Sequence, residues 1–201
     1  ATPLASTDAA IVFPFLHQPD PGLQLPTLLY DLSIIYYACG LRSADSSYAY
    51  TSLGSTMAIS ANHYAKVRGF PRRNAAEDFY LLNKLAKTGA IQSVPIQPIL
   101  LEGRLSDRVP FGTGAGIGKI ADMENPLEDF HFYNPDIFRL LKEFLAALAS
   151  TWGEPHALAG TSEEIRNYCE QCELEALIAK QIQSQTQRSV FEKFLHDWFD
   201  G

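Results

Sequence analysis

Two adjacent carboxylates, Glu77 and Asp78, stand near the start of the stretch RNAAEDFYLLNKLAKTG. They admit a structural interpretation, because Asn74 is a favourable N-cap residue and Glu77 follows it at the spacing of a capping box. An acid in the first turn also complements the helix dipole, which accounts for Asp78. They equally admit a chemical interpretation, because a carboxylate within hydrogen-bond reach of a hydroxyl can accept its proton.

A glycine-rich stretch downstream, EGRLSDRVPFGTGAG, carries groups that suit a phosphorylated ligand. Arg104 and Arg108 can clamp a diphosphate, because guanidinium forks match phosphate oxygens. Gly112, Gly114 and Gly116 allow backbone N–H groups to approach a ligand closely. A flexible surface loop without a ligand is the alternative interpretation.

Several other residues of reactive types are expected to be structural. His17 ends a predicted strand, and His63 lies in a strand-to-helix segment. Cys169 and Cys172 form a single C-x-x-C in a Glu- and Gln-rich helical pattern. Without a second pair or a nearby histidine, they are interpreted as ordinary helix residues. His131 lies close to two acids in the sequence, but we predict no metal site in this chain.

The elements that would position these groups change in character at about residue 130. Before it, extended and helical patterns alternate: strands are predicted over 9–17, 46–54 and 90–104, a buried helix over 25–41, and a strand turning into a helix over 55–70. After it, three stretches read as helices, at 134–150, 161–187 and 188–200. We therefore predict a mixed α/β portion over residues 1–130 and a helical appendage over residues 131–201.

Charge and composition exclude several classes of protein. The formal net charge is −7 and no long basic run occurs, which argues against nucleic acid as the main partner. No apolar run in the sequence reaches the roughly 18 residues that suggest a membrane span, and no charged-then-apolar leader is visible. The three cysteines are too scattered for a disulfide scaffold. A reducing compartment is then the default, and we expect a cytoplasmic protein.

An ordered series of segments between residues 9 and 118 resembles the second half of a family 2 glycosyltransferase domain. In that family a small-residue strand leads to a helix that ends in GGF-like residues, and STMAISANHYAKVRGF is the counterpart here. An ED pair then opens a helix of the form DxxLxxRLxxxG, and a strand follows; DFYLLNKLAKTG and IQSVPIQPIL stand in those places. The upstream AAIVFPFLH is similar to the strand that follows the metal-binding acids of such enzymes. The resemblance implies an α/β fold with a partial GT-A-like mixed sheet and flanking helices, followed by the helical appendage.

The same resemblance implies an inverting glycosyltransferase, which moves a sugar from a nucleotide-sugar donor to an acceptor hydroxyl. Asp78 would be the general base, and Glu77 would orient a group or cap the helix. The glycine-rich stretch lies where related enzymes have a mobile loop that closes over the donor, and a serine that follows Gly54 can touch the acceptor, although turn chemistry explains it equally well. The predicted substrate-binding residues are Glu77, Arg104, Arg108, Gly112, Thr113 and Ser55.

One part of the family pattern is missing. Family 2 enzymes bind Mg²⁺ or Mn²⁺ on the donor diphosphate through a D-x-D motif, and this sequence contains no D-x-D. We therefore expect the chain to be the C-terminal, acceptor-side piece of a longer enzyme, inactive by itself and able to pair with a second copy that covers exposed sheet edges. The alternative is a non-catalytic interaction domain in which the two carboxylates only cap a helix.

Overall fold

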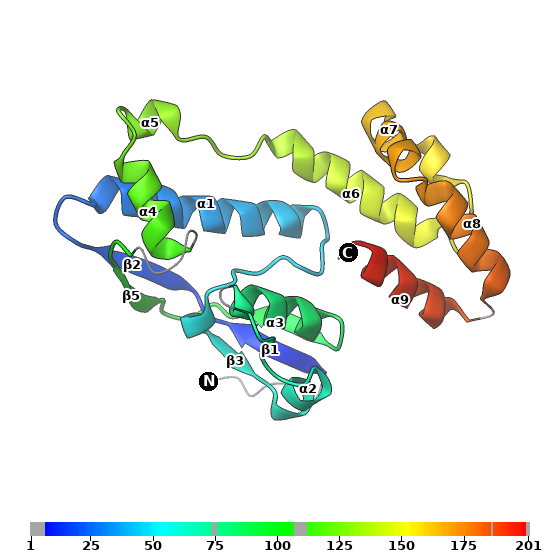
Figure 1. Ribbon diagram of the computed structural model, residues 1–201, viewed down its shortest axis with the longest axis horizontal. Coiled ribbons are helices and arrows are strands. Elements are labelled where there is room, and N and C mark those ends of the chain that lie inside the picture. The colour runs from blue at the N-terminus through cyan, green and yellow to red at the C-terminus, as the bar shows by residue number, and fades with distance from the viewer. Residues whose placement is uncertain (1–6, 74–75, 107–111, 186, 200–201) are drawn as a thin grey trace. The chain divides into compact units, whose positions relative to one another are not determined.

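The structure is a computed structural model that describes residues 7–73, 76–106, 112–185 and 187–199. Its contacts divide the chain into two compact units (Figure 1). The first comprises Ala1–Arg42 and Ser47–Tyr133, and the second comprises Ser43–Ser46 and Asn134–Gly201. The first unit is mixed α/β with two small sheets, and the second is helical. The predicted mixed α/β class with a helical C-terminal region is confirmed at this level.

The first sheet has the strand order β3-β1-β4. Its central strand, β1 (Asp8–Val12), is buried along its whole length, as expected for a strand covered on both faces. It pairs antiparallel with β3 (Met57–Ile59) and parallel with β4 (Ala90–Ser93), so the sheet is mixed.

Helix α3 (Glu77–Ala86) packs on this sheet and places the two predicted carboxylates at its first residues. Leu81, Leu82 and Leu85 are fully buried and share a core cluster with the alanines and the valine of β1. Burial of each leucine contributes about 1.5–3 kcal/mol to folding. Phe79 is apolar but 44 % exposed, because the buried face of the helix is centred on the three leucines.

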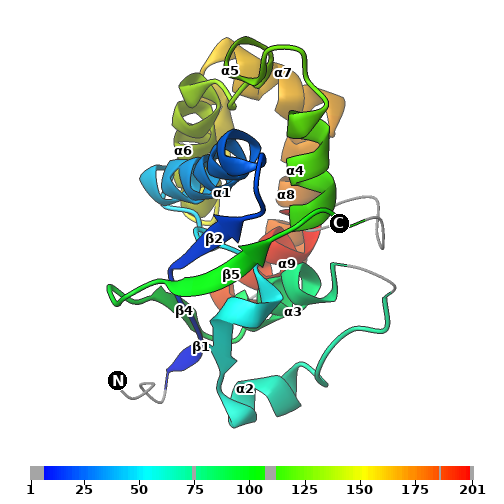
Figure 2. The same ribbon diagram turned by 90° about the vertical axis from the view of Figure 1, so that its left-hand side faces the viewer.

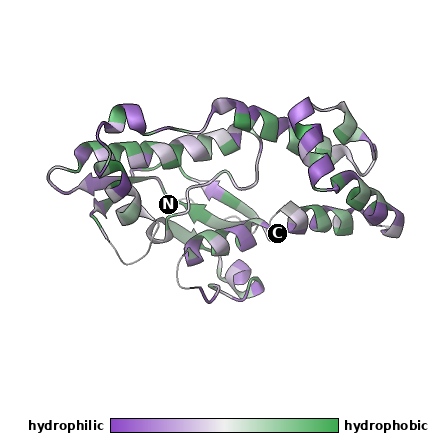
Figure 3. Ribbon diagram, turned by 45° about the horizontal axis from the view of Figure 1, so that its top comes forward, coloured by the Kyte–Doolittle hydropathy of each residue, from purple (hydrophilic) through white to green (hydrophobic). Residues whose placement is uncertain are grey.

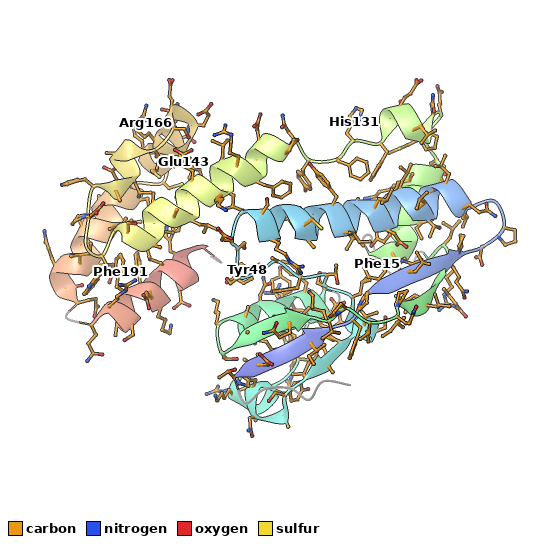
Figure 4. The ribbon with its side chains drawn as sticks, turned by 180° about the vertical axis from the view of Figure 1, so that it is seen from behind. Phe15, Tyr48, His131, Glu143, Arg166 and Phe191 are labelled. Atoms are coloured by element: carbon orange, nitrogen blue, oxygen red, sulfur yellow. The ribbon has the colours of Figure 1, made fainter. Side chains whose placement is uncertain are left out.

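The second sheet pairs β2 (Phe15–Pro19) with β5 (Ile99–Gly103) in parallel, with His17 opposite Leu101 (Figure 2). Phe15 and His17 are buried and their rings meet edge to face, whereas the intervening Leu16 is exposed. The covered face of this sheet therefore carries the first and third residues of β2. Helix α1 (Gln24–Ser43) lies along it (Figures 1 and 4), so the helix predicted over 25–41 is present. Its predicted burial is wrong in part, because Leu28, Leu32 and Ile35 are each more than 40 % exposed.

Two predicted strands are each divided in the structure, and the prolines explain the division. The strand predicted over 9–17 becomes β1 and β2, which join different sheets on either side of Pro14, whose nitrogen carries no hydrogen to donate. The extended segment over 90–104 likewise becomes β4 and β5, separated by a stretch that contains Pro95 and Pro98.

The strand predicted over 46–54 is wrong. No strand pairing involves this segment, which consists of turns followed by a 3₁₀ turn, η1 (Gly54–Thr56). Tyr50 is buried against α3, and its hydroxyl donates a hydrogen bond to the Asn83 side chain over 2.8 Å. The alternating tyrosines therefore serve packing against a helix and not a sheet.

The interpretation of the glycine-rich stretch as a flexible loop is wrong for its last residues, because Thr113–Ala121 form helix α4. Ile117 and Ile120 are buried, which supplies the packing that the three glycines of this helix do not. Two shorter helices, α2 (Ala61–Lys66) and α5 (Pro126–Asp129), complete the first unit.

The second unit consists of α6 (Pro135–Ser150), η2 (Ala157–Gly160), α7 (Glu163–Gln171), α8 (Leu174–Ser184) and α9 (Arg188–Phe199), together with the short segment Ser43–Ser46. Their apolar faces meet in one core, and Figure 3 shows green and purple residues alternating along these amphipathic helices. Phe191, labelled in Figure 4, is among its most buried members. The helix predicted over 161–187 is broken at Glu173, whose φ of 51° is left-handed.

Cys169 faces the core of the second unit, and this burial decides its reactivity. It is only 2 % exposed. Burial is the main cause that raises the pKa of its thiol above the ordinary 9.0, and the negative charge of the nearby Glu175 raises it further. Because thiolates and not thiols are the nucleophiles, we expect iodoacetamide at pH 8 to modify the exposed Cys39 at least about tenfold faster than Cys169.

Peptide mass spectrometry on a time course of alkylation gives the two rates for the same sample. In guanidinium chloride both cysteines are exposed, so their rates should converge. Equal rates in the folded protein would contradict the buried position of Cys169.

Candidate functional site

The start of helix α3 differs from the capping box that the sequence suggests. The N-cap position is occupied by Ala76, with φ 58° and ψ 24°, and no side chain caps it. Glu77 is the first helical residue and not the third, so it lies too early to close a capping box. Asn74, the predicted cap, lies outside the described residues. The left-handed turn at Ala76 is the physical reason for the later start, and it costs about 1–2 kcal/mol for a residue with a Cβ.

Asp78 joins helix α3 to the segment that precedes β3. Its Oδ1 accepts a hydrogen bond from the backbone N–H of Phe79 over 2.8 Å, and its Oδ2 accepts one from the N–H of Gly54 over 2.9 Å. The first bond serves the helix start, but the second reaches a residue 24 positions away. An ionised carboxylate offers roughly four lone-pair sites, so these two bonds leave lone pairs that can accept further hydrogen bonds.

Gly54 permits this close approach. A Cβ at position 54 would lie 3.0 Å from Oδ2 and 3.2 Å from Cβ of Asp78, closer than such atoms normally come. Ser55, predicted to contact the acceptor, is exposed in the same 3₁₀ turn. The structure therefore brings Ser55 next to the residue that binds Asp78. Glu77 is also exposed, as the first residue of α3.

The predicted diphosphate-binding arginines are not assembled into a clamp in the described residues. The side chain of Arg104 is 71 % exposed, and its guanidinium lies 3.6 Å from the carboxylate of Glu102 on the end of β5. Arg108 lies outside the described residues. Gly112 is the N-cap of α4, with φ 92°, a conformation that favours glycine. Thr113 is the first residue of that helix and is partly buried.

A buried pair that the sequence does not single out lies on α1 and β2. Asp31 of α1 is 3 % exposed and His17 of β2 is 5 % exposed. Oδ1 of Asp31 lies 2.5 Å from Nδ1 of His17, and Oδ2 accepts the backbone N–H of His17 over 3.0 Å. The signal for this pair in the sequence is the acid itself, because a lone aspartate inside an apolar helix is seldom buried unless it is paired.

Tyr30, the neighbour of Asp31 on α1, connects this pair to the predicted site. Its ring lies 6.1 Å from the ring of His17. Burial is the main cause that raises the pKa of its hydroxyl above 10.0, and the negative charges of Asp31 and Asp78 raise it further. A hydrogen bond with the side chain of Thr113 acts in the opposite direction and lowers it. The pKa of Tyr30 therefore depends on both the predicted base and the first residue of α4. Sequence reasoning missed this residue.

The described residues do not supply a metal centre. They contain no group of three or more His, Cys, Asp and Glu side chains that could hold a metal ion. His131 and its two acidic neighbours Glu128 and Asp129 are all exposed, on and after α5 (Figure 4). The side chains present thus do not fit the Mg²⁺ or Mn²⁺ of the family pattern. Among the helices of the described residues, none is long and apolar enough to cross a membrane.

No family model matches the chain, and neither the curated proteins nor the solved structures contain one with significant similarity to it. The family likeness therefore rests on the ordered motifs of the sequence alone.

Proposed function

We propose that this chain is the acceptor-side portion of an inverting, nucleotide-sugar glycosyltransferase, and that Asp78 is its general base. The observation that supports this proposal most is the placement of the Asp78 carboxylate. It is held between two backbone N–H groups from different segments, with lone pairs left for a ligand. A fixed carboxylate of this kind meets the geometric requirement for accepting a proton from an attacking hydroxyl.

In the proposed reaction the acceptor hydroxyl attacks the anomeric carbon of the donor sugar from the face opposite the nucleotide. The hydroxyl proton passes to the Asp78 carboxylate, the new glycosidic bond forms, and the bond from the anomeric carbon to the diphosphate breaks with its electron pair on the diphosphate oxygen. Ser55 lies on the acceptor side and Thr113 on the donor side of this arrangement. The mixed sheet β3-β1-β4 with α3 across it agrees with a partial GT-A-like fold.

The reaction needs a nucleotide-binding portion outside these 201 residues, because the sequence has no D-x-D motif and the described side chains form no metal centre. When bound, a divalent ion would neutralise charge on the donor diphosphate. The contribution of this chain is limited to orienting the acceptor, accepting its proton and shaping the donor side through the start of α4.

A second candidate is a non-catalytic interaction domain, and the bond from the N–H of Phe79 to Asp78 favours it. That bond satisfies one of the free donors of the first turn, as a capping side chain does. It does not explain why the same carboxylate reaches Gly54. We therefore retain the transferase as the main proposal.

The proposal is tested by incubating the complete gene product with Mn²⁺ and, in turn, UDP-glucose, UDP-galactose, UDP-N-acetylglucosamine and GDP-mannose. We expect at least one donor to release its nucleoside diphosphate, more quickly when an extract containing acceptors is added. Proton NMR of the product should show the anomeric configuration opposite to that of the donor. A folded complete protein that releases no diphosphate from any donor, or a product with retained configuration, would contradict the proposal.

A further inference from the structure

We propose that Tyr30 is a positioning residue of this site, which seats the start of helix α4 against α1 and so holds Thr113 on the same side of the unit as Asp78. The catalytic purpose of this positioning rests on the proposed function, but the contacts of Tyr30 can be tested without assuming that function. Nothing in the motif pattern of the sequence points to Tyr30.

The first support is the contact between the Tyr30 ring and the backbone of α4. A Cβ at Gly116 would lie 2.4 Å from Cε2 and 2.7 Å from Cδ2 of this ring, so only glycine fits. The backbone of α4 thus rests directly on the aromatic ring. Gly118, two residues along the same helix, is different, because a Cβ there would meet only Leu105, at an ordinary 3.6 Å.

The second support is that α4 needs a docking surface. It contains three glycines among nine residues, each of which disfavours a helix by about 1 kcal/mol relative to alanine. Such a segment is helical only while its packing holds it. Ile117 and Ile120 give it a buried edge, and the Tyr30 ring gives it the surface beneath Gly116.

The third support is the rigidity of Tyr30 itself. Its chain neighbour Asp31 is tied to β2 by two hydrogen bonds to His17, so the backbone of α1 is fixed at this point. The hydroxyl of Tyr30 interacts with Thr113 at the start of α4 and lies in the field of Asp78 at the start of α3. The pKa of the Tyr30 hydroxyl thus responds to both helix starts that the proposed reaction uses, while its ring makes the contact with the backbone of α4.

Gly116→Ala and Gly118→Ala form a matched pair, since both make the same change in the same helix. In hydrogen exchange of the complete protein, Gly116→Ala should speed exchange of the α4 amides about tenfold or more, because overpacking against the ring opens the helix. Gly118→Ala should slow it about fivefold, because alanine favours a helix. In a Tyr30→Ala background, the added effect of Gly116→Ala should vanish.

A titration tests whether Tyr30 lies in the field of Asp78. With ¹³Cζ-labelled tyrosine, and Tyr30→Phe to assign its signal, Asp78→Asn should lower the pKa of Tyr30, because a negative charge that disfavours the phenolate is removed. Thr113→Val should raise it, because a hydrogen bond that lowers the pKa is lost. Glu77→Gln, at the exposed neighbouring carboxylate, is the control and should shift it less than Asp78→Asn does.

Equal exchange in Gly116→Ala and Gly118→Ala, or a Tyr30 pKa unchanged by Asp78→Asn, would overturn the inference even in an active transferase. If both results are as expected but the complete protein releases no diphosphate from any donor, the positioning stands and the proposed function fails. If transfer is found, Tyr30→Leu should lower kcat at least about tenfold while Tyr30→Phe, which keeps the ring, retains most of it.

Discussion

Replacing His17 with leucine is expected to lower the free energy of unfolding of the first unit by about 3–5 kcal/mol. The leucine fills much of the same space, so the loss comes mainly from electrostatics. Asp31 is left as a buried carboxylate whose remaining hydrogen bond comes from the backbone N–H of residue 17. A buried charge without its partner is among the few causes of so large an effect.

The double variant His17→Leu with Asp31→Leu should recover most of this loss, because it removes the orphaned charge together with its partner. The exposed ion pair of Arg104 with Glu102 is the matched control. Arg104→Leu should change the free energy of unfolding by no more than about 1 kcal/mol, since that pair is screened by water.

The measurement must report the first unit alone. Both tryptophans, Trp152 and Trp198, belong to the second unit, so tryptophan fluorescence would follow the wrong transition. Hydrogen exchange of the β1 and α3 amides at rising urea concentrations reports the first unit directly. A loss below about 1 kcal/mol for His17→Leu, or a double variant less stable than the single one, would contradict a paired buried charge.

The predictable parts of the fold are those that local pattern controls. The apolar period of α1 and the run of leucines in α3 identify both helices, and their positions agree with the structure to within a few residues. The exposure of the apolar Phe79 and the division of the first strand at Pro14 both depend on which neighbours cover each face. Periodicity alone does not contain that information.

The candidate site shows the same limit. Asp78 is identified from a motif and Ser55 from its position after Gly54, and the N–H of Gly54 donates a hydrogen bond to Asp78. Tyr30 and Asp31 were missed because their partners are distant in sequence: His17 lies 14 positions from Asp31, and Thr113 lies on another helix. The capping box was wrong because Ala76 adopts a left-handed backbone conformation. An alanine in the sequence does not predict this conformation, as a glycine would.

Asp78→Asn is expected to lower sugar transfer by about 10²–10⁴-fold, the usual contribution of a positioned base. The amide has almost the shape of the carboxylate, and its oxygen can still accept one of the two backbone hydrogen bonds. Its nitrogen cannot accept the other, so we expect a loss of only about 1 kcal/mol in stability. An amide does not take a proton from a hydroxyl, which is why the rate falls much further than the stability.

Glu124→Gln is the matched control for the loss of one negative charge. Glu124 is exposed between α4 and α5, and it follows the end of α4 opposite to Thr113. Removing this charge should leave the rate of sugar transfer within about twofold of the original rate, because the field of an exposed charge is screened within roughly 10 Å. If both variants lost transfer equally, net charge and not the Asp78 carboxylate would be responsible.

The most direct test is therefore the initial rate of nucleoside diphosphate release by the complete protein and its Asp78→Asn variant, both shown by circular dichroism to be folded at the assay temperature. If Asp78 takes the acceptor proton, the variant is folded and slower by two orders of magnitude or more. If Asp78 only finishes the first turn of α3, the folded variant works at nearly the original rate, and that result would contradict its role as the base.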